Sequence, residues 1–324
     1  MKHLRLTLRR VSAALLLTLI FCTQALGAMP DYLIPCGNTV GIKLYTDGLL
    51  ITALDSPSPA KKAGLRAGDT ILEINGAPVH TAQEVAACLT DGSDVRVRVL
   101  REAREAEFLV APEKCACGYR LGAYIRDHIS GIGTLTFYDP ESGRYGALGH
   151  GVNDPSGLRL LQTAGGYLVA ASVSDVKKSM RGTPGALQGS FDTACRVGLV
   201  SKNSACGIFG TLQRPPLRAA LPVGAGCQVH TGAAVILANV DGASVEEYAA
   251  CIERLDPQDA QGRNLLLRVT DERLLEKTGG IVQGMSGSPI IQDGKLIGAV
   301  THVLVNSPEQ GYGIFIENML DAAG

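Results

Sequence analysis

The sequence predicts a mainly β protein with about two or three folded domains, a number that suits its 324 residues. Hydrophobic residues make up 46% of the chain, yet it has 39 Gly, only 6 Phe and no Trp. This balance favours strands that pack through Val, Ile, Leu and Ala and are joined by glycine-rich turns. The net charge of −1, with both signs mixed along the chain, gives no electrostatic footprint for nucleic acid, and we expect no nucleic-acid partner.

The amino terminus has the features of an export signal. Basic residues from Lys2 to Arg10 precede an apolar stretch at 11–21, and small residues at 25–28 could be cut. We therefore predict a signal peptide or membrane anchor over residues 1–28. The apolar stretch is short for a stable span, which favours cleavage. In either case the rest of the chain is expected to act outside the cytoplasm.

Cysteine usage fits this compartment without fixing a disulfide framework. Eight cysteines follow residue 28, an even number that permits disulfides, and buried free thiols are the alternative. Cys115 and Cys117 are one residue closer than in a zinc knuckle, and no second Cys/His pair has metal spacing. We expect no metal site and no cofactor.

Residues 37–112 alternate between strand and helix signals. The expected order is strands at 40–44 and 48–54, a helix at 58–65, a strand at 66–76, a helix at 81–89 and a strand at 94–100. Ser58 fits the start of the first helix and Gly64 its end. Thr81 and Glu84 fit a capping box at the start of the second.

The run Ser58–Gly76 resembles the PDZ domains of bacterial proteases, whose pattern SPAxKAGLxxGDxIxxING it matches in order. We predict a PDZ domain over residues 37–112. The resemblance implies a peptide groove between the strand at 41–44 and the helix at 81–89, where a partner's extended segment or carboxyl terminus would pair with backbone groups. The residues expected to bind it are Val40, Gly41 and Ile42. The alternative is a module that docks only against its own protease domain.

The segment Gly284–Pro289 resembles the nucleophile turn of trypsin-like serine proteases. An attacking serine must stand out of a tight turn whose backbone N–H groups point at the developing oxyanion. We predict Ser286 as the nucleophile and the N–H groups of Gly284 and Ser286 as the oxyanion hole; a surface loop is the alternative. A hairpin with an Asp-Gly turn at 290–300 and a strand at 311–316 are typical of the end of a double-barrel serine protease.

His150 is the candidate general base, in a glycine-flanked loop after a strand-like segment. The separation of 136 positions in the chain from His150 to Ser286 suits a pair contributed by two different barrels. The other histidines outside the export and PDZ segments are His128, His230 and His302, of which we expect His302 to line the cleft wall. Substrate backbone is expected to pair with the strand at 299–303.

The motifs GALGHG at 146–151, KTGGIVQGMSGSPIIQDGKLIGAVTHV at 277–303 and GYGIFIENML at 311–320 resemble the stage IV sporulation protein B peptidases. The resemblance covers the chain after residue 28 and implies a trypsin-like double β-barrel serine peptidase domain over residues 114–324. It assigns the serine and the histidine of the family to Ser286 and His150. It also implies a protease that cuts itself and a membrane-tethered regulator of an intramembrane protease complex, which then activates a late sigma factor. The place implied is the forespore intermembrane space.

The third catalytic residue stays open between several carboxylates. Asp271 matches the aspartate of the family, but it lies only 15 residues before Ser286, unlike the trypsin order. Asp154 ranks second, and Asp175 and Asp192 are further alternatives. Short connecting helices are expected at 242–248 and 272–278.

Two other functions remain alternatives. The chain could be an inactive protease fold whose PDZ groove serves as a peptide sensor, which the intact serine and histidine motifs argue against. It could also be a trypsin-like quality-control protease, but such enzymes usually place the PDZ domain after the protease domain, whereas here it comes first.

Overall fold

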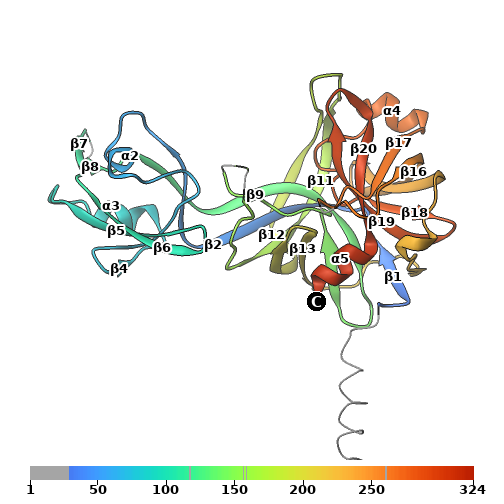
Figure 1. Ribbon diagram of the computed structural model, residues 1–324, viewed down its shortest axis with the longest axis horizontal. Coiled ribbons are helices and arrows are strands. Elements are labelled where there is room, and N and C mark those ends of the chain that lie inside the picture. The colour runs from blue at the N-terminus through green and yellow to red at the C-terminus, as the bar shows by residue number, and fades with distance from the viewer. Residues whose placement is uncertain (1–28, 117, 156, 158, 260) are drawn as a thin grey trace, which may run out of the picture.

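The computed structural model describes residues 29–324 except residues 117, 156, 158 and 260, so the signal peptide or anchor predicted for 1–28 lies outside the described residues. The chain forms a small and a large lobe, joined by two long antiparallel strands (Figure 1). These strands are β2 (Thr39–Leu54) and β9 (Ala123–Tyr138). Within the described part, no helix has the length and apolar character that crossing a bilayer requires.

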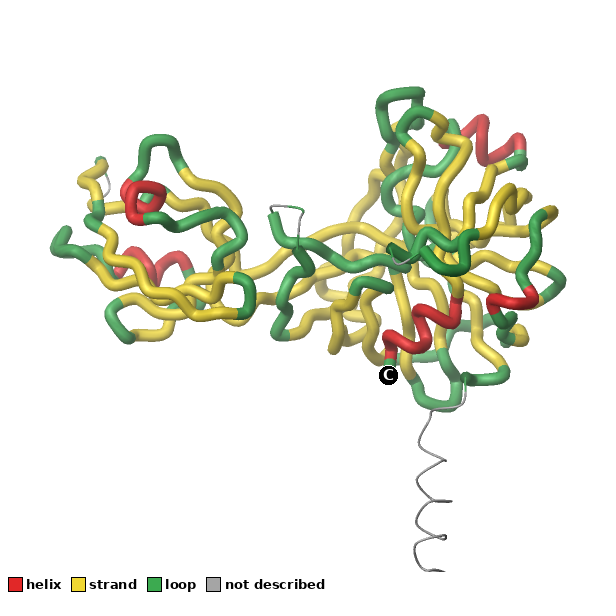
Figure 2. Tube along the Cα trace, viewed as in Figure 1, coloured by secondary structure: helices red, strands yellow, loops and turns green. Residues whose placement is uncertain are grey.

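The small lobe comprises residues 46–127 and packs two short helices against strands (Figure 2). Besides parts of β2 and β9, its elements are α2 (Pro59–Ala63), β3 (Thr70–Ile74), β4 (Ala77–Pro78), α3 (Ala82–Ala87), β5 (Val95–Arg101), β6 (Arg104–Val110), β7 (Glu113–Cys115) and β8 (Gly118–Arg120). Both predicted helices are confirmed. Ser58 accepts from the Lys61 N–H at 3.2 Å to start α2, and Thr81 and Glu84 form the capping box of α3.

The first barrel of the large lobe is a ring of six strands. Besides β2 and β9 it contains β10 (Arg144–Ala147), β11 (Gly165–Lys177), β12 (Ala186–Ser204) and β13 (Gly207–Leu212). The antiparallel order is β9-β10-β13-β12-β11-β2, and β2 pairs back to β9 to close the ring. The short strands β1 (Tyr32–Pro35) and β14 (Leu221–Pro222) extend the sheet beside β9.

The second barrel is closed in the order β15-β16-β17-β20-β19-β18. Its strands are β15 (Gly232–Asp241), β16 (Ser244–Leu255), β17 (Leu265–Val269), β18 (Pro289–Gln292), β19 (Lys295–Leu304) and β20 (Ser307–Phe315). The short helices η2 (Gly226–Gln228) and α4 (Glu272–Thr278) lie outside the ring. The predicted hairpin is confirmed, because Asp293 and Gly294 both have positive φ between β18 and β19.

A shared apolar cluster joins the two barrels. Helix α5 (Ile316–Ala323) contributes Ile316 and Met319 to this cluster, and both are fully buried. The other buried members come from both barrels: Leu33, Phe137, Phe209, Leu296, Ala299 and Ile314. Residues contributed by the two barrels can therefore hold a fixed geometry at the junction between them.

The structure differs from the sequence-based prediction in the order of the domains and in one helix. Residues 39–45 of β2 belong to the first barrel, so the small lobe is inserted between two barrel strands rather than placed ahead of the barrels. The helix predicted at 242–248 is wrong, because Ser244–Leu255 is strand β16. The helix predicted at 272–278 is confirmed as α4.

Candidate active site

A cavity of about 890 Å³ opens at the junction of the two barrels. His150 lines it from the first barrel, just after β10. Ser286 and Gly284 line it from the segment between α4 and β18, and His302 from β19. The structure thus brings the predicted nucleophile, base and oxyanion glycine to one cavity.

The turn that carries Ser286 depends on its two glycines. Gly284 has φ +101° and Gly287 has φ +98°, a region that side chains rarely adopt. A Cβ at Gly287 would lie 2.1 Å from the carbonyl oxygen of Thr134. The N–H groups of Gly284 and Ser286 donate to no group among the described residues, so both can donate to a substrate oxygen.

The hydroxyl of Ser286 rests on the backbone of β19. It donates to the carbonyl oxygen of Thr301 at 2.7 Å and, within the described chain, makes no hydrogen bond to His150. Ser286 is half-buried and Thr301 is buried. To be deprotonated by His150, the serine must therefore first leave Thr301.

His150 is oriented by its own chain. Its Nδ1 lies 2.9 Å from the carbonyl oxygen of Gly151. Because a carbonyl can only accept, Nδ1 carries the proton and Nε2 keeps the lone pair that a general base needs. Burial lowers the pKa of His150 from its ordinary value, and the hydrogen bond to Gly151 opposes this in part.

His302 lies beside His150, with the two ring centroids 5.0 Å apart. Burial, then the charges of His150 and Arg263, lower the pKa of His302 to about 4. The imidazole of His302 is therefore neutral at pH 7. His302 lines the cavity wall, as expected from the sequence.

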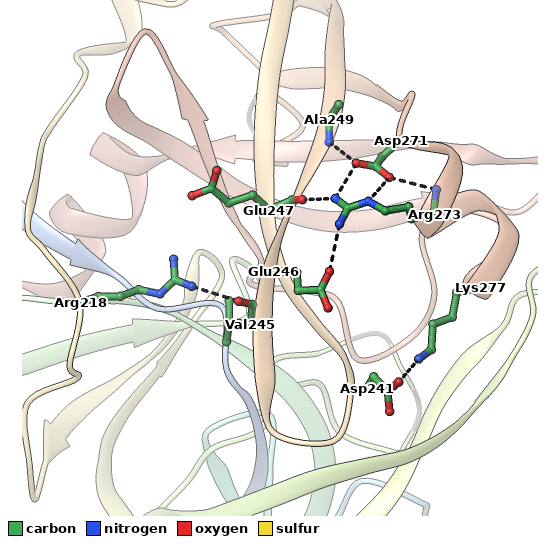
Figure 3. A network of polar contacts seen from close by, with 9 residues as sticks. All are labelled: Arg218, Asp241, Val245, Glu246, Glu247, Ala249, Asp271, Arg273 and Lys277. Carbon is green, nitrogen blue, oxygen red and sulfur yellow. Dashed lines mark hydrogen bonds and ion pairs between the residues drawn. The ribbon is translucent and has the colours of Figure 1, made fainter.

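Asp271 lies in a different polar network, which Figure 3 shows. Its carboxylate accepts from the backbone N–H of Arg273 at 3.0 Å, as the cap of α4, and from the Arg273 side chain at 3.0 and 3.1 Å. It also accepts from the backbone N–H of Ala249 at 3.2 Å. The hydrogen bonds from the Arg273 side chain are the main reason that the pKa of Asp271 lies below its ordinary value. The structure does not bring Asp271 to His150, whose ring is held by Gly151 instead.

The other carboxylates considered also face elsewhere. Asp154 lies against the small lobe, where a Cβ on Gly68 would be 2.8 Å from its Oδ2. Asp175 accepts from the N–H of Val176, and Asp192 accepts from the N–H groups of Ala194 and Cys195 in its own strand, β12. None of the three lines the cavity that holds His150.

The predicted peptide groove is misplaced. Val40, Gly41 and Ile42 pair with β9 on one edge and with β11 on the other, so no edge is left for a peptide. A Cβ on Gly41 would also lie 2.5 Å from the ring of Phe191. The cause is that β2 runs without interruption from the small lobe into the barrel.

A groove does exist in the small lobe, at another strand. A cavity of about 270 Å³ lies between α3 and residues 119–125, and Ala82, Val85 and Ala86 of the helix line it. Strand β9 pairs here with β2 along one edge, from Ala123 to Arg126. The sequence contained a signal for it, because the run GYRLGAYI at 118–125 has aromatic and apolar residues typical of a strand, with Gly118 at its start and Gly122 within it.

The structure forms no disulfide between the cysteines that it describes. Those that it describes are unpaired: Cys36, Cys88, Cys115, Cys195, Cys206, Cys227 and Cys251. Burial raises the pKa of the Cys36 thiol far above its ordinary value.

The two six-stranded barrels share a cavity that holds a serine in a glycine turn and an oriented histidine. With the inserted lobe, these features define a PDZ-containing protein of the serine peptidase class. The profile of the PDZ domain matches residues 50–101. The profile of the SpoIVB peptidase S55 family matches residues 117–320. The chain belongs to the SpoIVB peptidase S55 family.

Individual relatives match more locally. The magnetosome formation protease MamE of Magnetospirillum gryphiswaldense is 44% identical over 82 residues, which are 24% of this chain and 9% of that protein. MamE of Paramagnetospirillum magneticum is 40% identical over 58 residues, 17% of this chain and 8% of that protein. The chain thus spans less than a tenth of the length of these curated relatives.

Matches among solved structures have low sequence identity and low TM-scores. The inactive form of the Rv3671c protease matches with a TM-score of 0.34 at 18% identity, over 59% of this chain and 82% of that chain. The active form, from M. tuberculosis, matches with a TM-score of 0.33 at 19% identity, over 74% of this chain and 83% of that chain.

Proposed function

We propose that this chain is an exported serine endopeptidase in which Ser286 is the nucleophile and His150 the general base. The observation that carries the proposal is that both side chains line one cavity between the barrels, where the N–H groups of Gly284 and Ser286, which have no acceptor in the described part of the chain, lie beside the nucleophile. Membership of the SpoIVB peptidase S55 family supports it.

The reaction begins when the Ser286 hydroxyl turns from the Thr301 carbonyl towards His150. Nε2 of His150 takes the hydroxyl proton while Oγ bonds to the substrate carbonyl carbon, and the N–H groups of Gly284 and Ser286 hold the resulting oxyanion. His150 then gives the proton to the leaving amine as the peptide C–N bond breaks. Water, deprotonated by the same imidazole, releases the acyl group and restores Ser286.

Substrate is expected to bind along β19. Strand β18 pairs with β19 only as far as Ala299, whereas Thr301, His302 and Val303 line the cavity. An extended substrate can pair with this stretch, and its N–H next to the scissile bond can take the place of the Ser286 hydroxyl on Thr301. Binding of substrate would thereby free the nucleophile.

The biological role we propose is a signalling cut in sporulation. Resemblance to the family implies cleavage of the chain itself and of a membrane-tethered regulator of an intramembrane protease complex. It also implies export to the forespore intermembrane space. The groove between α3 and residues 119–125, rather than Val40–Ile42, would recognise a peptide segment of the target.

A fluorophosphonate probe, read by intact mass, tests the proposal directly. The parent protein should gain one adduct, Ser286→Ala should gain none, and His150→Gln should react far more slowly because the base is lost. Ser288→Ala is a matched control, since Ser288 lies in the same turn and its buried hydroxyl has no partner in the described structure. An adduct on Ser286→Ala at the parent's rate would reject the nucleophile.

One observation favours the second candidate, a peptide-binding sensor without activity, namely that Ser286 bonds to Thr301 and not to His150. The sensor predicts that the parent takes no adduct and cuts no protein while its small lobe still binds peptide. A parent that reacts at Ser286 rejects the sensor.

A further inference from the structure

We propose that Thr134 is a positioning residue that sets the geometry of the oxyanion hole from outside the substrate cavity. This inference rests on the proposed function, since it takes Ser286 as the nucleophile. Thr134 lies on β9 with only 1% of its surface exposed, and it is not among the residues that line the cavity. It would therefore act through the nucleophile turn and not through contact with substrate.

Thr134 holds the nucleophile turn at two points. Its Oγ1 donates to the carbonyl oxygen of Gly284 at 2.7 Å, and its backbone N–H donates to the carbonyl oxygen of Ser286 at 2.9 Å. These carbonyls belong to the peptide units that follow Gly284 and Ser286. The first of these two units lies between the two oxyanion N–H groups.

The neighbouring peptide units are fixed by other partners. The carbonyl of Gln283, in the unit that carries the Gly284 N–H, accepts from Leu187 at 2.8 Å. The carbonyl of Met285, in the unit that carries the Ser286 N–H, accepts from Ser288 at 2.9 Å. The unit between them is held at both ends: its carbonyl accepts from the side-chain hydroxyl of Thr134, and its N–H, that of Met285, donates to the carbonyl of Val282 at 3.1 Å. Loss of the hydroxyl removes the shorter of these two bonds, and because the unit follows a glycine with positive φ, it can then tilt about the bond that remains.

Thr134 also contacts the histidine segment. Its carbonyl oxygen accepts from the N–H of Leu148 at 3.1 Å, two residues before His150. A Cβ on Gly287 would lie 2.1 Å from that carbonyl oxygen and 2.6 Å from the Leu148 nitrogen, so the three segments are closely packed. One residue of β9 thus contacts both the turn that carries the nucleophile and the segment that carries the base.

The chain offers a matched control two residues away on the same strand. Thr136 is fully buried, and its hydroxyl has no hydrogen-bond partner among the described groups. Thr134→Val and Thr136→Val each replace a buried hydroxyl with a methyl group of similar size. Only the first removes a bond to the nucleophile turn.

The experiment measures the burst and turnover of p-nitrophenyl acetate by the whole chain, with Ser286→Ala as the blank. We expect Thr134→Val to lower the acylation rate about tenfold, equivalent to about 1.4 kcal/mol, with KM unchanged because Thr134 does not touch substrate. Thr134→Ser, which keeps the hydroxyl, should restore the rate. Thr136→Val should react as the parent does.

Distinct outcomes separate the two hypotheses. A burst from Ser286→Ala equal to that of the parent overturns the proposed function. If Ser286→Ala is silent but Thr134→Val acylates at the parent's rate, only the role of Thr134 is overturned. That role is also overturned if Thr134→Ser is as slow as Thr134→Val, or if Thr136→Val is equally slow. If Thr134→Val melts below the assay temperature, Thr134→Ala replaces it under the same criteria.

Discussion

The imidazole of His150 donates to a neutral carbonyl, that of Gly151, where a serine protease triad has a carboxylate. A carbonyl fixes the tautomer and the ring orientation as well as an aspartate does. It carries no full charge, however, so it stabilises the imidazolium formed during acylation less strongly. In the site we propose, His150 is therefore oriented by a backbone carbonyl, and the Ser286 hydroxyl rests on Thr301.

Asp271 provides a sharp test of this arrangement. As the cap of α4, it can be replaced by asparagine, which caps equally well, whereas alanine should cost about 1 kcal/mol of unfolding free energy. We expect Asp271→Asn to react with fluorophosphonate at close to the parent's rate, and Asp271→Ala to differ mainly in urea unfolding. If Asp271 supported His150 as a triad aspartate, Asp271→Asn would instead lower kcat by about four orders of magnitude.

The sequence could show that Ser286 and His150 suit a catalytic pair, because their glycine-flanked segments and spacing are local features. The partner of His150 could not be read in the same way, since it is a backbone carbonyl that no residue type marks. For Asp271, its position directly before the helix at 272–278 was the visible signal of a cap. Thr134 was visible only as a polar residue in an apolar strand.

The pH dependence should reflect the buried state of His150. Burial lowers its pKa from the ordinary value of 6.5, so the neutral base persists to lower pH than for an exposed histidine. We expect kcat/KM for p-nitrophenyl acetate to rise with pH through a midpoint below 6.5, and to stay near its maximum at pH 7. A midpoint above 6.5 would contradict this environment.

Elements with local signals were predicted well, and elements decided by distant pairing were not. The capping box of α3 and the Asp-Gly turn before β19 are properties of a few adjacent residues. Strand β16 contains Glu, Ala and Tyr in an order that suggested a helix, but pairing with β15 and β17 overrides that preference. The groove strand was misassigned because β2 continues through sixteen residues and offers the same pattern in both lobes.

The relocated groove can be tested on α3. Ala86 is exposed and lines the cavity beside residues 119–125, so Ala86→Trp should fill it without disturbing the core. We expect loss of peptide binding in a phage-displayed peptide selection, while the p-nitrophenyl acetate burst is kept. Ala87→Trp is the control, since Ala87 is exposed on the same helix and does not line the cavity. Peptide binding that survives Ala86→Trp but is lost on Ala87→Trp would contradict the placement.

At the scale of the whole molecule, the small lobe enters and leaves through adjacent strands. Tyr45 of β2 and His128 of β9 are direct partners in the register. Replacing residues 46–127 by Asn-Gly would thus join the pair through a two-residue hairpin turn. We expect this variant to keep its β circular dichroism and its reaction with fluorophosphonate, and to lose peptide binding.

The same variant should be somewhat less stable than the parent. Leu50 of the small lobe packs into the core of the first barrel, and its removal exposes apolar surface there. Full burial of a leucine contributes about 1.5–3 kcal/mol, which sets the scale of the expected loss in urea unfolding. A variant that lacks cooperative unfolding would show that the barrel depends on the inserted lobe.

The insertion also imposes an order on how the chain acquires its structure. Strand β2 is synthesised early, but its barrel partner β9 follows only after roughly 80 further residues, and closing so long a loop directly carries a large entropy cost. Once the small lobe has folded, its two ends emerge side by side, and the effective loop shrinks to a few residues, a gain of about 2–3 kcal/mol. The lobe for which we propose peptide recognition would then act during synthesis as the nucleus that brings the first two barrel strands together.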